Sequence, residues 1–185
     1  IEDCAARSPD VRLDDVGFPR AEYCHCAVCE ERFAASDHDD RGDWRASVIT
    51  AFVARAADRI PGRTYLAVHP DPYPGRLRAR SGIDLGAVSE FVDEVVVPLY
   101  DTAYGTTYWI ESLAAGFADR LGNLEENIDL GVELYALNVD VEDLLAAADV
   151  AEAYADAVYF GYESGTARAA LRRRRAEERE GESFG

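Results

Sequence analysis

The sequence contains no lysine. All 19 of its basic residues are arginine, and 36 acidic residues give the chain a net charge of −17. Such a chain repels itself at ordinary ionic strength, whereas molar salt screens charges separated by more than about 3 Å. The composition therefore predicts a protein of a salt-saturated cytoplasm, such as that of a halophilic archaeon. It argues against nucleic acid and anionic membrane as partners, because both bind basic surfaces.

Long apolar runs, methionine and flexible linkers are also missing. No apolar stretch approaches the roughly 20 residues that a membrane span needs. The chain begins at Ile1 and contains no Met, so we expect that a natural start has been removed. No Ser/Gly-rich or low-complexity block interrupts the sequence, which predicts a single domain over residues 1–185.

Cysteine is scarce, but its spacing is informative. Three of the four cysteines form a C-x-C-x-x-C turn at Cys24, Cys26 and Cys29, and the fourth is Cys4. Four thiolates make a closed tetrahedral site of the kind that holds structural zinc. We therefore predict that all four bind one zinc ion through a loop at residues 20–35. The alternatives are free buried cysteines, a disulfide and an iron–sulfur cluster, each of which usually occurs with a different spacing or compartment.

Five segments have the pattern of β-strands, and helical patterns separate them. The strands are expected at Val11–Gly17, Thr64–His69, Val95–Tyr100, Ile128–Ala136 and Ala157–Gly161. Between the first two, Trp44, Val48, Phe52 and Ala56 recur at four-residue intervals. Ile49, Val53 and Ile60 lie beside them, which predicts one apolar stripe on a helix of about four turns. Alternating strands and helices indicate a parallel sheet with right-handed crossovers.

The sheet could be doubly wound, or it could be part of an eight-stranded barrel. We expect the C-terminal five βα units of a (β/α)8 TIM barrel, because polar residues gather at the carboxyl ends of the strands, where such barrels carry their chemistry. Five strands do not close such a barrel. The missing part is expected either in a segment before Ile1 or in a homo-oligomer.

The segment VRLDDVGFPRAEYCHCAVCEERF resembles the fourth-strand region of TIM-barrel glycoside hydrolases, where an apolar strand ends in Asp and a C-x-C-x-x-C turn follows. The zinc-containing β-galactosidases of the retaining clan have a similar cysteine cluster, completed by one upstream Cys, and uncharacterised hydrolase-like barrels share the Asp-bearing strand. PLYDTAYGTTYW, LGVELYALN and VYFGYESG fit the sixth, seventh and eighth strands. The chain departs from that clan in having Asp14-Asp15 where the clan has Asn-Glu. The resemblance implies a glycoside hydrolase with a saccharide substrate.

Asp14 and Glu133 are the candidate catalytic pair. On its own strand, each carboxylate lies on the face opposite the apolar residues, so both are expected to project into the barrel mouth. Two opposed carboxylates suffice for glycoside hydrolysis, since one protonates the leaving oxygen and the other attacks or activates water. The alternative is that both are structural, with Asp14 paired to the neighbouring Arg12.

Further polar and aromatic residues end or follow the strands and are candidates for substrate binding. Flat rings in a polar cleft suit the apolar faces of sugars. Tyr162 follows the last strand, and the other candidates are Asp15, His69, Asp71, Tyr100, Asp101, Trp109, Tyr135 and Glu163.

Two functions fit these residues. The first is a glycoside hydrolase, and the second is a carbohydrate-binding or structural barrel without catalysis. A zinc methyltransferase of the barrel type would need an open metal position, which a four-cysteine site excludes.

Overall fold

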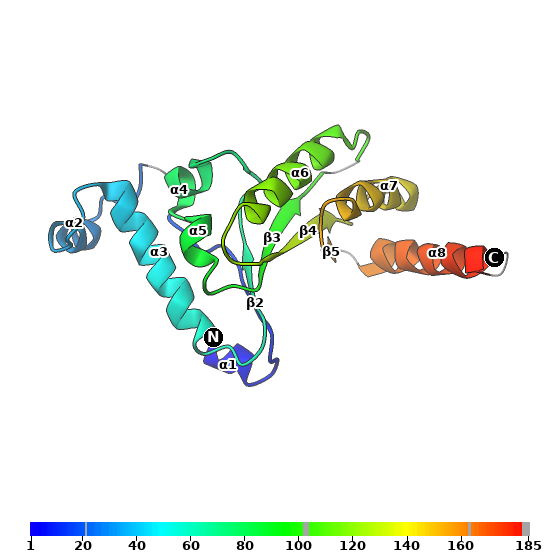
Figure 1. The fold of residues 1–185 in the computed structure, drawn as a ribbon. Coiled ribbons are helices and arrows are strands. Elements are labelled where there is room, and N and C mark those ends of the chain that lie inside the picture. The colour runs from blue at the N-terminus through cyan, green and yellow to red at the C-terminus, as the bar shows by residue number, and fades with distance from the viewer. Residues whose placement is uncertain (21, 102–103, 163, 183–185) are drawn as a thin grey trace.

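The computed structural model describes residues 1–20, 22–101, 104–162 and 164–182. Its strands are all parallel and form one sheet in the order β1-β2-β3-β4-β5. They are β1 (Val11–Leu13), β2 (Thr64–Ala67), β3 (Glu94–Leu99), β4 (Asp129–Tyr135) and β5 (Ala157–Gly161). The predicted alternating α/β fold is confirmed: the curled sheet and the helices between its strands form a half-barrel (Figure 1).

Helices connect successive strands, one short helix precedes the first strand and one helix follows the last. They are α1 (Glu2–Ala5), α2 (Ala27–Ala34), α3 (Arg41–Ala57), α4 (Arg76–Ser81), α5 (Leu85–Val88), α6 (Tyr108–Gly122), α7 (Val141–Glu152) and α8 (Ser164–Glu182). Over the described residues, none of these helices combines the length and the apolar character that crossing a membrane requires.

The apolar core lies between the sheet and its helices. Leu66, Val95, Leu99, Val132 and Leu134 point to this side and are fully buried. Side chains alternate along a strand, so the residues between them point to the concave face. This alternation puts the polar side chains of the strands on the inside of the half-barrel, as the sequence predicted.

The buried face of α3 contains most of the predicted apolar stripe. Asp40 caps the helix by accepting a hydrogen bond from the Asp43 amide at 3.0 Å. Ile49 and Val53 are buried, whereas Val48 and Phe52 are 37% and 40% exposed. Trp44 and Ala56 are buried as well. Because a helix has 3.6 residues per turn, positions four apart drift around it, which leaves Val48 and Phe52 at the edge of the buried face.

The first strand is shorter than predicted and ends at Leu13. Asp15 adopts a left-handed backbone with φ of 51°, and its amide donates a 3.0 Å hydrogen bond to the Asp14 carboxylate. A left-handed residue cannot continue a strand. Asp14 and Asp15 therefore lie in a turn at the carboxyl edge of the sheet, and His69 follows β2 at the same edge.

Candidate functional site

Glu133 lies in β4 on the concave face of the half-barrel. Its Oε2 accepts hydrogen bonds from the Arg12 guanidinium at 2.8 Å and from the Tyr100 hydroxyl at 2.7 Å. The side chain is only 13% exposed. Gly161 of β5 leaves room for it, because a Cβ at that position would lie 2.8 Å from Glu133 Oε1. Residues of β1, β5 and the end of β3 thus hold one carboxylate in place.

The two donors keep their hydrogen-bonding character over a wide pH range. Burial raises the pKa of the Tyr100 hydroxyl, and the hydrogen bond to Glu133 and its charge raise it further. Burial lowers the pKa of Arg12, but the hydrogen bond to Glu133 and the charges of Glu133 and Asp14 outweigh burial and leave that pKa above its ordinary value. Glu133 therefore always has a phenol donor and a cation beside it.

Arg12 connects the two candidate catalytic carboxylates. The Nη2 atom that binds Glu133 also lies 3.6 Å from Asp14 Oδ2. The nearest oxygens of Asp14 and Glu133 are therefore no more than about 6.4 Å apart, the two contacts laid end to end. Retaining glycosidases place their carboxyl groups about 5–5.5 Å apart and inverting ones about 6.5–9.5 Å apart. The structure brings the pair together, with a guanidinium between them.

A pocket of about 310 Å³ opens beside Asp14 at the carboxyl ends of β1 and β2. Its lining includes two predicted substrate-binding residues, Asp15 and His69. Burial, followed by the charge of Arg80, lowers the pKa of His69 below its ordinary value, and Asp15 acts in the opposite direction. A neutral imidazole both donates and accepts hydrogen bonds, which suits contact with hydroxyl groups.

Three tyrosines form a cluster next to Glu133. Tyr100, Tyr135 and Tyr162 end or follow β3, β4 and β5, and their ring centroids lie 5.4–5.7 Å apart. Tyr100 and Tyr162 are 40% and 74% exposed. Tyr162 has a φ of 71°, and strained backbone of this kind is concentrated at functional sites. The cluster offers exposed aromatic rings beside the carboxylate.

Trp109 contacts the tyrosine cluster indirectly, through Tyr104. Its ring stacks on Tyr104 at a centroid distance of 6.3 Å and an interplanar angle of 9°. The buried Tyr104 hydroxyl donates to the Leu99 carbonyl and accepts from the Tyr135 amide. Trp109, predicted as a substrate-binding residue, therefore packs against the residue that fixes the end of β4.

The remaining predicted binding residues are more scattered. Asp71 lies 3.6 Å from Arg76 in an ion pair and lines a different pocket from that of Asp14. Asp101 is half-buried and directly follows Tyr100. Glu163 lies outside the described residues.

Sequence reasoning missed the central place of Arg12, which was considered only as a partner of Asp14. A signal was present, because Arg12 precedes Asp14 by two residues and so shares its face of the strand. Its contact with Glu133 joins β1 and β4, which are separated in the sheet by two strands. Only the curl of the sheet, which the strand pattern does not reveal, brings them together.

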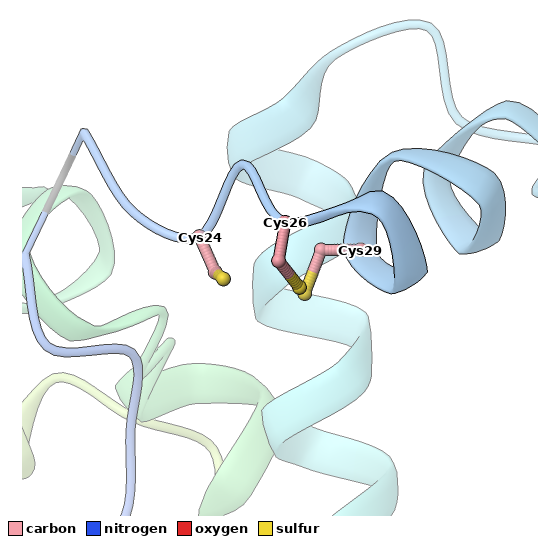
Figure 2. A group of neighbouring side chains, drawn as sticks. All are labelled: Cys24, Cys26 and Cys29. Atoms are coloured by element: carbon pink, nitrogen blue, oxygen red, sulfur yellow. The ribbon is translucent and has the colours of Figure 1, made fainter.

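A second group of side chains lies in the loop before α2. Cys24, Cys26 and Cys29 have sulfur atoms that all lie within 4.8 Å of one another (Figure 2). Cys26 is the N-cap of α2, and Cys29 lies in its first turn. Zinc binds thiolates at about 2.3 Å, so a small closure of this group would bring all three onto one ion. The donor set fits a soft metal.

The three thiols influence one another. Hydrogen bonding to the Cys29 backbone, and then to the thiols of Cys24 and Cys29, lowers the pKa of Cys26 to about 7. The hydrogen bond with Cys26, followed by burial, raises the pKa of Cys29 to about 11. The neighbouring groups therefore stabilise negative charge on the Cys26 sulfur through hydrogen bonds, and a bound cation would neutralise that charge.

Arg41, the first residue of α3, anchors the cysteine loop. It donates to the Cys24 carbonyl and lies 3.1 Å from Glu30 in an ion pair. His25 lies 2.7 Å from the other Glu30 oxygen. The Arg41 guanidinium also lies over the Trp44 ring, 5.5 Å from its centroid. The loop is thus attached to the start of α3.

The structure does not bring Cys4 to the other cysteines, so the four-cysteine site predicted from the sequence is wrong. Cys4 lies in α1, where Glu2 pairs with Arg59 just beyond the end of α3. Cys24 is bound at the start of that helix, and 17 helical residues extend about 25 Å. Figure 1 shows α1 and α2 at opposite ends of α3.

The fold is similar to that of a solved glycoside hydrolase domain. The PgaB (BpsB) glycoside hydrolase domain from Bordetella bronchiseptica matches 90% of this chain with a TM-score of 0.60 and 15% sequence identity. The match covers 56% of that domain, so the chain spans about half of its length. No protein-family model matches the sequence, and no curated protein matches it. The similarity shows the fold, a partial TIM-like barrel of the kind that a glycoside hydrolase uses.

Proposed function

We propose that this chain is a glycoside hydrolase-like enzyme that acts on a saccharide with Glu133 and Asp14 as its two carboxylates. The observation that carries the proposal is the geometry of Glu133, which Arg12 and Tyr100 hold with its nearest oxygen no more than about 6.4 Å from that of Asp14. Both donors bind Oε2, and within the described part of the chain no donor contacts Oε1. Oε1 is therefore the oxygen for attack on the anomeric carbon or for activation of water.

Asp14 is proposed as the proton donor to the leaving oxygen. Its side chain is 64% exposed and lies beside the pocket of Asp15 and His69. The tyrosine cluster of Tyr100, Tyr135 and Tyr162 provides aromatic rings for the sugar faces. The similarity to a glycoside hydrolase domain supports this assignment at the level of fold. Cys24, Cys26 and Cys29 are proposed to hold zinc in the loop that follows β1, remote from the reacting groups.

Glu133→Gln tests the proposal. The amide keeps the shape of the side chain but can neither attack nor accept a proton, so turnover of aryl glycosides in molar KCl should fall by at least about 100-fold. Asp14→Asn should reduce turnover less for substrates with activated leaving groups, which need little protonation. Glu90→Gln, at an exposed position before β3, is the control and should retain full activity. Equal rates in all three variants and the parent would refute the assignment.

A non-catalytic saccharide-binding protein is the second candidate. The observation that favours it is the Arg12 guanidinium, which lies between the two carboxylates and pairs with both. An arginine in that position opposes proton donation by Asp14, while the tyrosine cluster would still bind sugar. Calorimetric binding of oligosaccharides without any turnover, in both the parent and Glu133→Gln, would establish this alternative.

A further inference from the structure

We infer that Cys24, Cys26 and Cys29 bind one zinc-like divalent ion through three thiolates and leave its fourth coordination position to a small ligand from solution. The inference rests on the metal binding proposed above and adds the state of that fourth position. It is independent of glycoside hydrolysis, because its tests measure the metal itself.

The three sulfur atoms are placed to supply three of the four corners of a tetrahedral metal site. All lie within 4.8 Å of one another, close to the separation of two thiolates that share an ion at about 2.3 Å. Cys26 and Cys29 come from the start of α2 and Cys24 from the preceding loop, and in Figure 2 all three sulfurs are directed to the same region. The Arg41 contact with the Cys24 carbonyl holds the loop in that position.

No fourth ligand from the described residues joins this group. Among the described Cys, His, Asp and Glu residues, these three are the group of three or more whose ligand atoms all lie within 4.8 Å of one another. Cys4 lies at the other end of α3, and neither ring nitrogen of His25, whose Nδ1 lies 2.7 Å from Glu30, belongs to the group of ligand atoms within 4.8 Å of one another. The Cys26 side chain is exposed, so the remaining face of the site is open to solvent.

An open position changes what the metal can do. Four-thiolate zinc sites are closed and structural, whereas a site with three protein ligands keeps a position for water or another ligand. The site assigned here should therefore exchange its fourth ligand with thiols or imidazole in solution. It should also release metal to chelators more readily than a closed site.

Metal content tests the ligand set. The full 185-residue chain, purified under reducing conditions in molar KCl, should bind one Zn²⁺ per chain. Cys4→Ser is the matched control and should leave stoichiometry and affinity unchanged, whereas Cys24→Ser, Cys26→Ser and Cys29→Ser should each weaken binding by more than 100-fold, beyond the roughly 10–100-fold cost of losing an outer partner of a ligand. Metal loss in Cys4→Ser, or no metal in the parent, would overturn the inference.

Cobalt tests the open position without any substitution. Co²⁺ added to the metal-free parent should give a thiolate charge-transfer band with the intensity of three sulfurs, and its visible d–d bands should shift when imidazole or 2-mercaptoethanol is added. A charge-transfer band with the intensity expected for four sulfurs, or a spectrum that changes with neither imidazole nor 2-mercaptoethanol, would overturn the inference.

Light scattering should show the same molar mass with and without metal, because a metal-dependent dimer would mean that a second copy supplies the fourth ligand.

Discussion

At the scale of single residues, the site depends on one carboxylate that is held from three sides. Glu133 receives two hydrogen bonds on Oε2, and its other oxygen lies against the backbone of Gly161. Two donors from different strands restrict the side chain to one orientation, because any rotation breaks at least one bond. Orientation of this kind is what a nucleophile or base requires.

Gly161→Ala tests whether that orientation matters. The new Cβ would lie 2.8 Å from Glu133 Oε1, so the carboxylate must shift from the position in which Arg12 and Tyr100 bind it. The end of a Glu side chain yields easily, and we expect a stability loss at the low end of the roughly 1–3 kcal/mol of overpacking, with a fall in aryl glycoside turnover of about tenfold or more. The matched control is Gly122→Ala at the end of α6, where a Cβ meets nothing within 4 Å. If both variants retain full turnover, the precise position of Glu133 is unimportant.

At the scale of elements, Arg45 joins α3 to two segments that line the pocket, the loop after β1 and the end of α4. It lies in α3, is 3% exposed, and donates to the carbonyls of Arg20, Ala79 and Arg80. Its guanidinium lies 4.9 Å from the Phe18 ring centroid. One buried cation therefore ties α3 to the end of α4 and to the loop that follows β1, which carries both the Asp14 turn and the cysteine loop.

Arg45→Met should be strongly destabilising. Methionine fills much of the same volume but removes three part-buried hydrogen bonds to carbonyl groups, which we expect to cost about 3 kcal/mol in total. For a chain of this size that loss lowers Tm by roughly 6–12 °C. Arg55→Met, at an exposed position of the same helix, is the control and should change stability by less than about 0.5 kcal/mol. Thermal unfolding in molar KCl measures both, and equal effects would contradict the role given to Arg45.

The elements themselves could be predicted from the sequence, whereas several contacts between them could not. Strand positions followed from apolar alternation, and the parallel order followed from the intervening helices. The early end of β1 depends on the left-handed Asp15, which residue type alone does not specify. Cys4 was misassigned because thiol count and spacing do not say where the short α1 lies, and its position is set by the length of α3.

At the scale of the whole molecule, the charge balance decides how the protein responds to salt. Arginine ion pairs connect its surface elements: Arg173 lies 3.0 Å from Glu142, and Arg174 contacts both Asp149 and Glu152, so α8 is held to α7. Salt weakens such exposed pairs, but each contributes only about 0–1 kcal/mol. The net charge of −17 acts over the entire surface, and screening relieves that repulsion.

We therefore expect Tm to rise steeply from 0.1 M to 1 M KCl and more slowly above it, because the screening length falls from about 10 Å to about 3 Å over that range. Each kcal/mol of repulsion that is relieved should raise Tm by roughly 2–4 °C. Potassium sulfate at matched ionic strength separates screening from the strengthening of apolar burial, since sulfate adds the second effect. The KCl curve alone should carry most of the rise below 1 M. A Tm that stays constant or falls as KCl increases would mean that the ion pairs outweigh the repulsion, and the adaptation to a salt-saturated cytoplasm would be refuted.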